Sequence, residues 1–184
     1  LGLVDSVEVI KGGQSALYGN NAVAGVIKIT TRRPSEELAG QIQTSVGSYD
    51  SYNGRTALTG TIGSLGFSAH AEHDETEGYR DNSQYEADGG GLKLDWSPTK
   101  WFMAYGSFSG VDSDYGLPGS LTRAQVSADP TQTSNPLDEG EEKARYLRAG
   151  VNLYLSDSWT LSVDAGHTDR KIFSNFVSSF FTFD

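Results

Sequence analysis

Apolar and polar residues alternate with a period of two along most of the chain after Pro34. Leu147, Val151 and Leu153, for example, alternate with Arg148 and Asn152. This is the period of a β-strand with one apolar and one polar face. Many of the runs are about 10 residues long, the length that a tilted strand needs to cross a bilayer. We expect roughly seven strands, at residues 39–49, 52–62, 65–75, 87–97, 100–111, 145–156 and 158–170.

The segment before Pro34 has a different pattern. Residues 4–11 alternate well enough for a short strand, and residues 14–18 are long enough for one helical turn. Residues 23–31 form a β-branched run that predicts a second strand. Gly12 breaks the first strand, and Pro34, which cannot donate to a ladder, closes the segment. We therefore expect a strand–turn–strand unit ahead of the alternating region.

The connections between the later strands alternate in length. Residues 62–65, 97–99 and 156–158 are short connections, whereas 75–86 and 112–143 are long. A transmembrane β-barrel has short turns on one side of the membrane and long loops on the other. A soluble β-sandwich, the competing fold, has loops of similar length at both ends. The pattern predicts a mainly β protein, part of a large antiparallel transmembrane β-barrel.

The alternation also predicts which way side chains point. In a membrane-spanning barrel the apolar positions face lipid and the polar positions face the lumen. We expect lipid-facing side chains at Leu92, Leu94, Leu147, Val151, Leu153, Leu161 and Val163, and lumen-facing side chains at Lys93, Asp95, Arg148, Asn152 and Asp164. Trp96 and Trp101 flank one short turn and Trp159 another, as rings at a membrane interface do.

Composition narrows the functional classes. The chain has 14 basic and 24 acidic residues and a formal net charge of −10, and most of the acidity lies in residues 72–88 and 112–142. A nucleic-acid binder needs a basic face, so this class is excluded. The absence of cysteine excludes disulfides, zinc thiolate sites and cysteine nucleophiles. Because the chain begins at Leu1 and ends in an aromatic stretch, we expect a segment of a longer protein.

Residues 7–31, VEVIKGGQSALYGNNAVAGVIKITT, resemble the last part of the plug domain of TonB-dependent outer-membrane receptors. The family pattern is a strand ending in a basic residue and Gly, a turn containing S-A-L-Y-G, a small-residue turn and G-V-I-x-I. Lys11 stands where the family more often has Arg, Gly13 where it often has Pro, and Lys28 replaces a common Asn. The residues that would build the plug itself are Gly12, Tyr18, Gly19 and Gly25.

The resemblance implies an organisation and a function. Residues 1–34 would be the C-terminal part of the plug domain, and 35–184 the first roughly seven strands of an incomplete barrel, which in this family has 22 strands and a plugged lumen. The implied function is TonB-dependent active transport of a scarce solute across the outer membrane of a Gram-negative bacterium. Ferric siderophores are the commonest substrates of the family, with cobalamin, haem and oligosaccharides as alternatives. A soluble β-sandwich that binds carbohydrate is the competing function.

The resemblance also implies partners. These are the TonB energy-coupling protein, a ferric siderophore or similar small ligand, and outer-membrane lipid and lipopolysaccharide; the full-length receptor would be a monomer. No enzyme activity, catalytic residue or cofactor is expected. In such receptors the basic residue at the end of the first plug strand pairs with carboxylates of the barrel wall, so Lys11 is our candidate for a plug latch.

Candidate ligand contacts come from the loops and the polar face. The stretch 115–121 is rich in turn residues and opens the longest connection, which makes Tyr115 and Leu117 candidates. Arg80 and His70 are the other two candidates. On a strand, His70 shares one face with Glu72 and Asp74, a set that could bind a transition metal or form a hydrated polar wall. Neither this set nor the acidic loops, which lack calcium-loop spacing, is assigned a metal.

Overall fold

The structure, a computed structural model, describes residues 4–18, 22–31 and 33–177. Its first part is an antiparallel hairpin of two strands, β1 (Val4–Lys11) and β2 (Gly25–Thr31), with the one-turn helix α1 (Ser15–Tyr18) between them. This is the strand–turn–strand unit that the first segment predicts. We call it the plug hairpin, after the domain that its sequence resembles.

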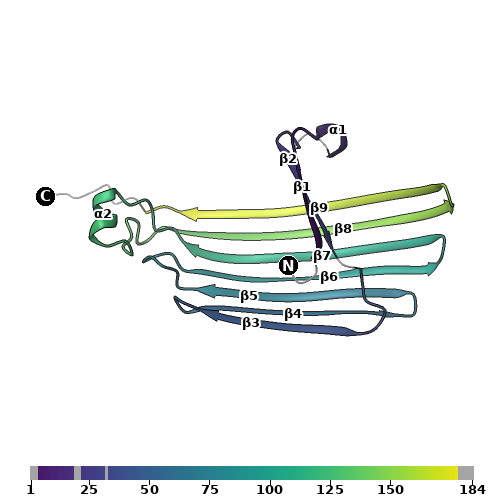
Figure 1. Cartoon of the computed structure of the whole chain (residues 1–184), viewed down its shortest axis with the longest axis horizontal. Helices are drawn as coiled ribbons and strands as arrows, with labels where there is room; N and C mark the ends of the chain where they lie inside the picture. The colour runs from purple at the N-terminus through teal and green to yellow at the C-terminus, as the bar shows by residue number, and fades with distance from the viewer. Residues whose placement is uncertain (1–3, 19–21, 32, 178–184) are drawn as a thin grey trace.

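The rest of the chain forms one sheet of seven antiparallel strands (Figure 1). Each strand pairs with the next strand in sequence, so the sheet is a simple meander. The seven predicted strands are found, in the predicted places. They are β3 (Ala39–Gly47), β4 (Ser51–Ile62), β5 (Leu65–Thr76), β6 (Tyr85–Thr99), β7 (Phe102–Gly116), β8 (Glu139–Ser156) and β9 (Trp159–Asn175).

After the first turn, residues 48–50, which is short and lies at the loop end described below, the connections sort by length between the two ends of the sheet. At one end, on the right in Figure 1, lie the tight turns 63–64, 100–101 and 157–158; we call this the turn end. At the opposite end lie the first long loop (residues 77–84) and the second long loop (residues 117–138); we call this the loop end. The predicted alternation of short and long connections is therefore present.

The strands run further toward the loop end than the alternation predicts. β8, for example, begins at Glu139 rather than at residue 145. Tyr85 lies opposite Tyr115, and Gly116 lies opposite Glu139, so strand pairing continues into acidic and glycine-containing sequence. Backbone ladder bonds do not require an apolar face, because every non-proline residue carries one donor and one acceptor. The apolar pattern therefore underestimates strand length at this end.

The second long loop contains a helix that the sequence analysis did not predict, α2 (Arg123–Ala128). Thr122 caps it: the Thr122 hydroxyl accepts from the Gln125 amide, and the Gln125 side chain accepts from the Thr122 amide. Among the residues that the structure describes, no helix is both long and apolar enough to cross a membrane.

The two faces of the seven-stranded sheet differ in chemistry, as predicted. Leu92, Phe108 and Leu147 lie opposite one another on adjacent strands and are 46–55% exposed. Val151 and Val163 pair further along the same face. We call this the outer face. In the described part of the chain no second sheet packs against it, so the sandwich arrangement, in which such residues would be covered, is not present.

The opposite, inner face is polar and curves around a cavity. Of the five predicted lumen-facing residues, Lys93, Asp95, Arg148 and Asn152 line this cavity. The fifth, Asp164, does not line it but lies 3.2 Å from Arg148 Nη2. The plug hairpin crosses in front of the sheet (Figure 1), and Ile29 of β2 lines the same cavity. The inner face is therefore the face that lies toward the plug hairpin.

Candidate functional site

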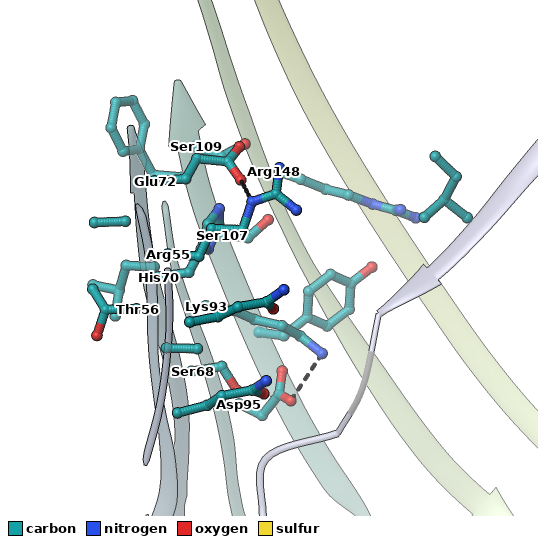
Figure 2. A pocket seen from close by; sticks show the side chains of 18 of the residues that line it. Arg55, Thr56, Ser68, His70, Glu72, Lys93, Asp95, Ser107, Ser109 and Arg148 are labelled. Atoms are coloured by element: carbon teal, nitrogen blue, oxygen red, sulfur yellow. Dashed lines mark ion pairs between the residues drawn. The ribbon is translucent and has the colours of Figure 1, made fainter. Parts of the chain in front are cut away.

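The inner-face cavity has a volume of about 760 Å³. Its walls come from β3 to β8 and from Ile29 of the plug hairpin, and its lining is rich in charged and hydroxyl-bearing side chains (Figure 2). The alternation places them there, because every second residue of a strand points to the same side of the sheet. Segments far apart in sequence thus contribute to one polar surface.

Ion pairs between neighbouring strands organise this surface. Arg55 Nε lies 3.6 Å from Glu72 Oε2, and Arg55 Nη2 lies 3.5 Å from Asp74 Oδ1. Within β6, Lys93 Nζ lies 3.1 Å from Asp95 Oδ2. Asp95 is only 8% exposed, and a carboxylate removed from water needs such a cation. The sequence analysis placed Lys93 and Asp95 on this face, as residues two apart on one strand must be, but did not pair them.

Three buried polar atoms of the cavity wall have no hydrogen-bond partner among the described residues: Arg55 Nε, His70 Nδ1 and Asp95 Oδ1. Arg55 Nε faces Glu72 at ion-pair distance, 3.6 Å, so the other two are the atoms most available for further bonds. Buried polar atoms in native proteins are nearly always paired with protein or water. A solute, water or another protein segment in the cavity would therefore find a donor or acceptor at each of these positions.

The structure confirms the predicted arrangement of the histidines on β5. His70 and Glu72 line the inner-face cavity, and Asp74 lies on the same face, bonded to Asn53 and Arg55. His73 points to the outer face, where its Nδ1 lies 2.9 Å from Asp88 Oδ1. With Glu86 these two form the one group in the described part of the chain close enough to share a metal ion. Both carboxylates are exposed and the imidazole is bonded to Asp88, so a surface ion pair accounts for the group.

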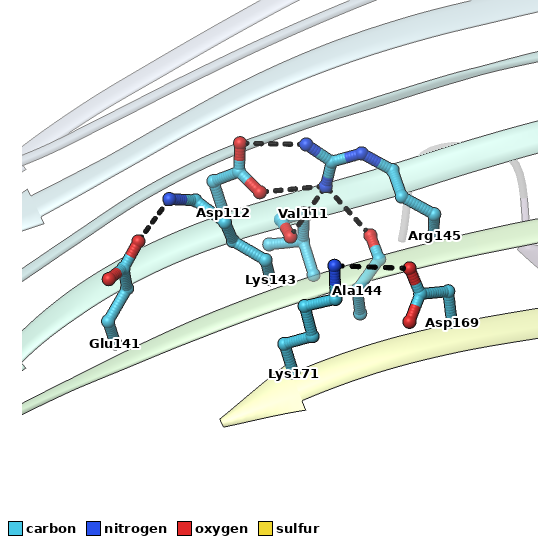
Figure 3. Close-up of polar contacts among 8 residues, drawn as sticks. All are labelled: Val111, Asp112, Glu141, Lys143, Ala144, Arg145, Asp169 and Lys171. Atoms are coloured by element: carbon cyan, nitrogen blue, oxygen red, sulfur yellow. Dashed lines mark hydrogen bonds and ion pairs between the residues drawn. The ribbon is translucent and has the colours of Figure 1, made fainter. Parts of the chain in front are cut away.

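A belt of charged residues lies on the outer face near the loop end (Figure 3). Arg145 donates two bonds to the Asp112 carboxylate, at 2.7 and 2.8 Å. Lys143 pairs with Glu141, and Lys171 lies 3.8 Å from Asp169. This belt lies beyond the apolar part of the same strands, so the outer face changes from apolar to charged toward the loop end.

The predicted loop contacts occupy different surroundings. Tyr115 belongs to β7 rather than to the predicted loop, and it lines a second cavity of about 310 Å³ at the loop end with Tyr85 and several carboxylates. Leu117, two residues after Tyr115, is half-buried. Its amide donates to Asp138 O at 2.9 Å. Arg80 lines neither cavity; its guanidinium donates to backbone carbonyls of the second long loop. The structure therefore does not bring Arg80, Tyr115 and His70 together.

The plug residues can be placed only in part. Lys11 ends β1 opposite Gly25, and its side chain is exposed. Gly12 has φ +95° and donates to Ala24 O at 3.1 Å, a conformation that glycine adopts readily. A Cβ on Gly25 would lie 2.7 Å from Ile10 O. The side chain of Tyr18 and all of Gly19 lie outside the described residues.

Comparisons with known proteins agree with these features. Residues 1–26 match the family model described as TonB-dependent Receptor Plug Domain. The pesticin receptor of Yersinia pestis is 42% identical over 59 residues, which are 32% of this chain and 9% of that protein. The metal-pseudopaline receptor CntO of Pseudomonas aeruginosa is 24% identical over 187 residues, 90% of this chain and 25% of that protein. The chain thus spans a quarter or less of these relatives.

Solved structures share the fold. The ferric yersiniabactin uptake receptor FyuA of Yersinia pestis aligns with a TM-score of 0.85 at 22% identity, over 96% of this chain and 30% of that one. The ferric citrate transporter FecA aligns with a TM-score of 0.83 at 19% identity, over 97% and 28%. Residues 1–26 thus match the plug domain of TonB-dependent receptors, and the sheet that follows has the fold of the barrel wall in the receptors FyuA and FecA.

Proposed function

We propose that this chain is part of a transporter that imports a ferric siderophore across the outer membrane with energy delivered by TonB. The observation that carries the proposal is the plug hairpin in front of a polar, ion-paired inner face (Figure 2). A solute that passed between plug and wall would meet charged and hydroxyl-bearing side chains from several strands. The names of the relatives support the substrate class, since they include a ferripyoverdine receptor and an iron-regulated outer membrane virulence protein.

We divide the chain into two functional parts. Residues 1–34 form the C-terminal part of the plug, and residues 35–184 form the first roughly seven strands of the barrel. In this division the apolar outer face contacts lipid, and the tryptophans of the turn end sit at the membrane interface. The loop end then faces the medium, because outer-membrane barrels have their long loops outside.

The partners follow from this orientation. The belt cations Lys143, Arg145 and Lys171, each paired with a carboxylate in this structure, lie where phosphate groups of lipopolysaccharide would meet the barrel and exchange for those carboxylates. TonB acts on the plug from the periplasmic side. The barrel closes around its own plug, so the full-length receptor works as a monomer. Its role is binding and transport, not catalysis.

Ligand and latch residues are assigned by position. Tyr115 and Leu117 lie at or near the loop-end cavity, where an arriving solute would first make contact. His70 lies deeper, in the inner-face cavity. Lys11 is the latch: its exposed ammonium at the end of β1 is free to pair with wall carboxylates of the complete barrel.

Uptake by a deletion strain tests the function. Cells lacking the gene, and cells lacking TonB, should both fail to accumulate ⁵⁵Fe presented as a panel of ferric siderophores, and the cloned gene should restore uptake only when TonB is present. Labelled cobalamin, haem and maltodextrin serve as comparison solutes. Uptake of one of these, with iron uptake unchanged, would replace the siderophore assignment; uptake independent of TonB would contradict the mechanism.

A further inference from the structure

Arg80 ties the two long loops together. Its guanidinium donates from Nε to Gln132 O at 3.1 Å, from Nη1 to Gly119 O at 2.7 Å and from Nη2 to Pro118 O at 3.1 Å. Arg80 belongs to the first long loop, and all three acceptors belong to the second. Bonds with a charged donor are about twice as strong as neutral ones, and the planar guanidinium directs its donors in a fixed fork.

Asn82 and a backbone bond add to this connection. Asn82 Nδ2 donates to Asn135 O at 2.6 Å and to Asp138 O at 2.8 Å. The Asp81 amide donates to Thr131 O at 2.8 Å. Asn82 has φ +58°, a left-handed conformation that asparagine tolerates better than most residues. The first long loop thus contacts both halves of the second.

The acceptor carbonyls are themselves fixed. Pro118 O also accepts from the Ser134 amide at 3.0 Å. Gly119 has φ +68°, and a Cβ there would lie 2.3 Å from Ser134 Oγ. Asp138 is 3% exposed, and its carboxylate accepts from Asn135 Nδ2 at 2.6 Å. The second long loop is therefore folded back on itself around the groups that bind Arg80.

Arg80 does this without a carboxylate partner, although both loops are acidic. None of the ion pairs in the described part of the chain includes Arg80. Backbone carbonyl dipoles stabilise its charge instead. The side chain is half-buried. A side chain with its Nε and both terminal nitrogens already bonded to backbone is poorly placed to hold a solute as well.

We propose that Arg80 is a positioning residue that makes the two long loops one body, rather than a ligand contact. A displacement of one long loop is then shared by the other, while Tyr115 stays fixed in β7 between its partners Tyr85 and Gly140. This coupling is a property of the loops alone and does not depend on which solute the protein carries.

Hydrogen exchange measured by mass spectrometry on the full-length protein in detergent, without any ligand, tests the coupling. Arg80→Gln should raise the amide exchange rate about tenfold or more in both long loops. Losing one hydrogen bond of a charged group changes the opening equilibrium by about this factor. The informative amides are Asp81, Leu117 and Ser134, which the structure bonds to loop carbonyls. Arg123→Gln is the matched control, because Arg123 is exposed on α2 and the charge change is identical; it should leave these amides unchanged.

Arg80→Lys should not restore protection, since one ammonium lacks the fork that spans three carbonyls. Faster exchange confined to the first long loop would show that the loops are independent and would overturn the proposal. If Arg80→Gln disturbed the strands, Asn82→Asp provides the second test: it keeps the shape but replaces the donor with an acceptor, and it should also loosen both loops. The exchange measurement contains no solute. It can therefore fail while the uptake experiment succeeds, and the reverse is equally possible.

Discussion

Lys11 is the residue for which we predict a mechanical role. Lys11→Ala in the full-length receptor should leave siderophore affinity near normal but alter uptake or pore leakage. A partly screened ion pair contributes about 1 kcal/mol, which biases the plug without locking it. Radiolabelled uptake and antibiotic leakage measure the two effects. Lys28→Ala is the control, because Lys28 pairs with Glu8 at 3.4 Å inside the plug hairpin. If siderophore binding were lost while uptake, pore leakage and plug stability stayed unchanged, Lys11 would be a binding residue instead.

Gly25 is predicted to be required for the close approach of β1 and β2. Gly25→Ala would place a Cβ 2.7 Å from Ile10 O, a backbone atom that cannot turn away. We expect about 1–3 kcal/mol of local destabilisation, seen as faster hydrogen exchange in β1 and β2. Gly13→Ala is the matched control, since its Cβ would lie 3.5 Å from Val23 O, an ordinary contact. Equal exchange in the two variants would contradict this reading of Gly25.

At the level of elements, the turn that follows α2 depends on an ionised carboxylate. The Thr131 hydroxyl and amide both donate to Asp129 Oδ1, at 2.6 and 2.8 Å, and these bonds lower the pKa of Asp129. A depressed folded pKa means that the stabilisation is complete above the unfolded value, about 4, and is lost as the pH falls through the lower folded value.

Titration of the Asp129 carboxylate by NMR should therefore give a pKa below 3.8, the ordinary value of an aspartate side chain. Thr131→Val should raise that pKa, because it removes the hydroxyl donor, which is the larger cause of the shift. Thr133→Val is the control, since the Thr133 hydroxyl donates to Pro118 O rather than to Asp129. A midpoint that does not respond to Thr131→Val would assign the shift to another cause.

In the whole molecule, the proposed barrel places the outer face of each strand against lipid and the inner face against the polar lumen. Val163 lies on the outer face opposite Val151, and Ser162 points to the inner face beside it in sequence. Val163→Arg should destabilise the folded barrel in lipid by about 2–4 kcal/mol, the cost near the bilayer midplane. Ser162→Arg should cost far less. Guanidinium unfolding in phospholipid vesicles measures both, and similar losses would argue against a lipid-facing outer face.

Much of the sheet could be predicted from the sequence, because its information is local. The period of two sets which residues share a face, and tight turns mark where one strand ends and the next begins. Leu92, Lys93 and Asp95 were therefore assigned to the correct faces before any pairing was known. The acidity of the long loops could also be predicted. The extension of β7 to Gly116 could not, because an acidic stretch has no alternation of apolar and polar residues.

The candidate site could be predicted only in part. His70 was placed on the polar face with Glu72, and both line the inner-face cavity. The bonds of Arg80 to carbonyls 38 to 52 residues away could not be predicted. Neither could the pairing of Arg55 with Glu72 and Asp74. These contacts depend on strand register and loop path, which no local pattern encodes.

The sequence by itself determined the family resemblance, the strand count and the two-faced character of the sheet. Each of these depends on residue type and spacing along the chain, and strand sterics impose the same period wherever the segment lies. The tertiary structure decided which charges meet across strands, that Asn82 and Arg80 bind one loop to the other, and that Ile29 of the plug hairpin lines a cavity with the wall. Those contacts join residues far apart in sequence, and only the folded path of the backbone brings their atoms within bonding distance.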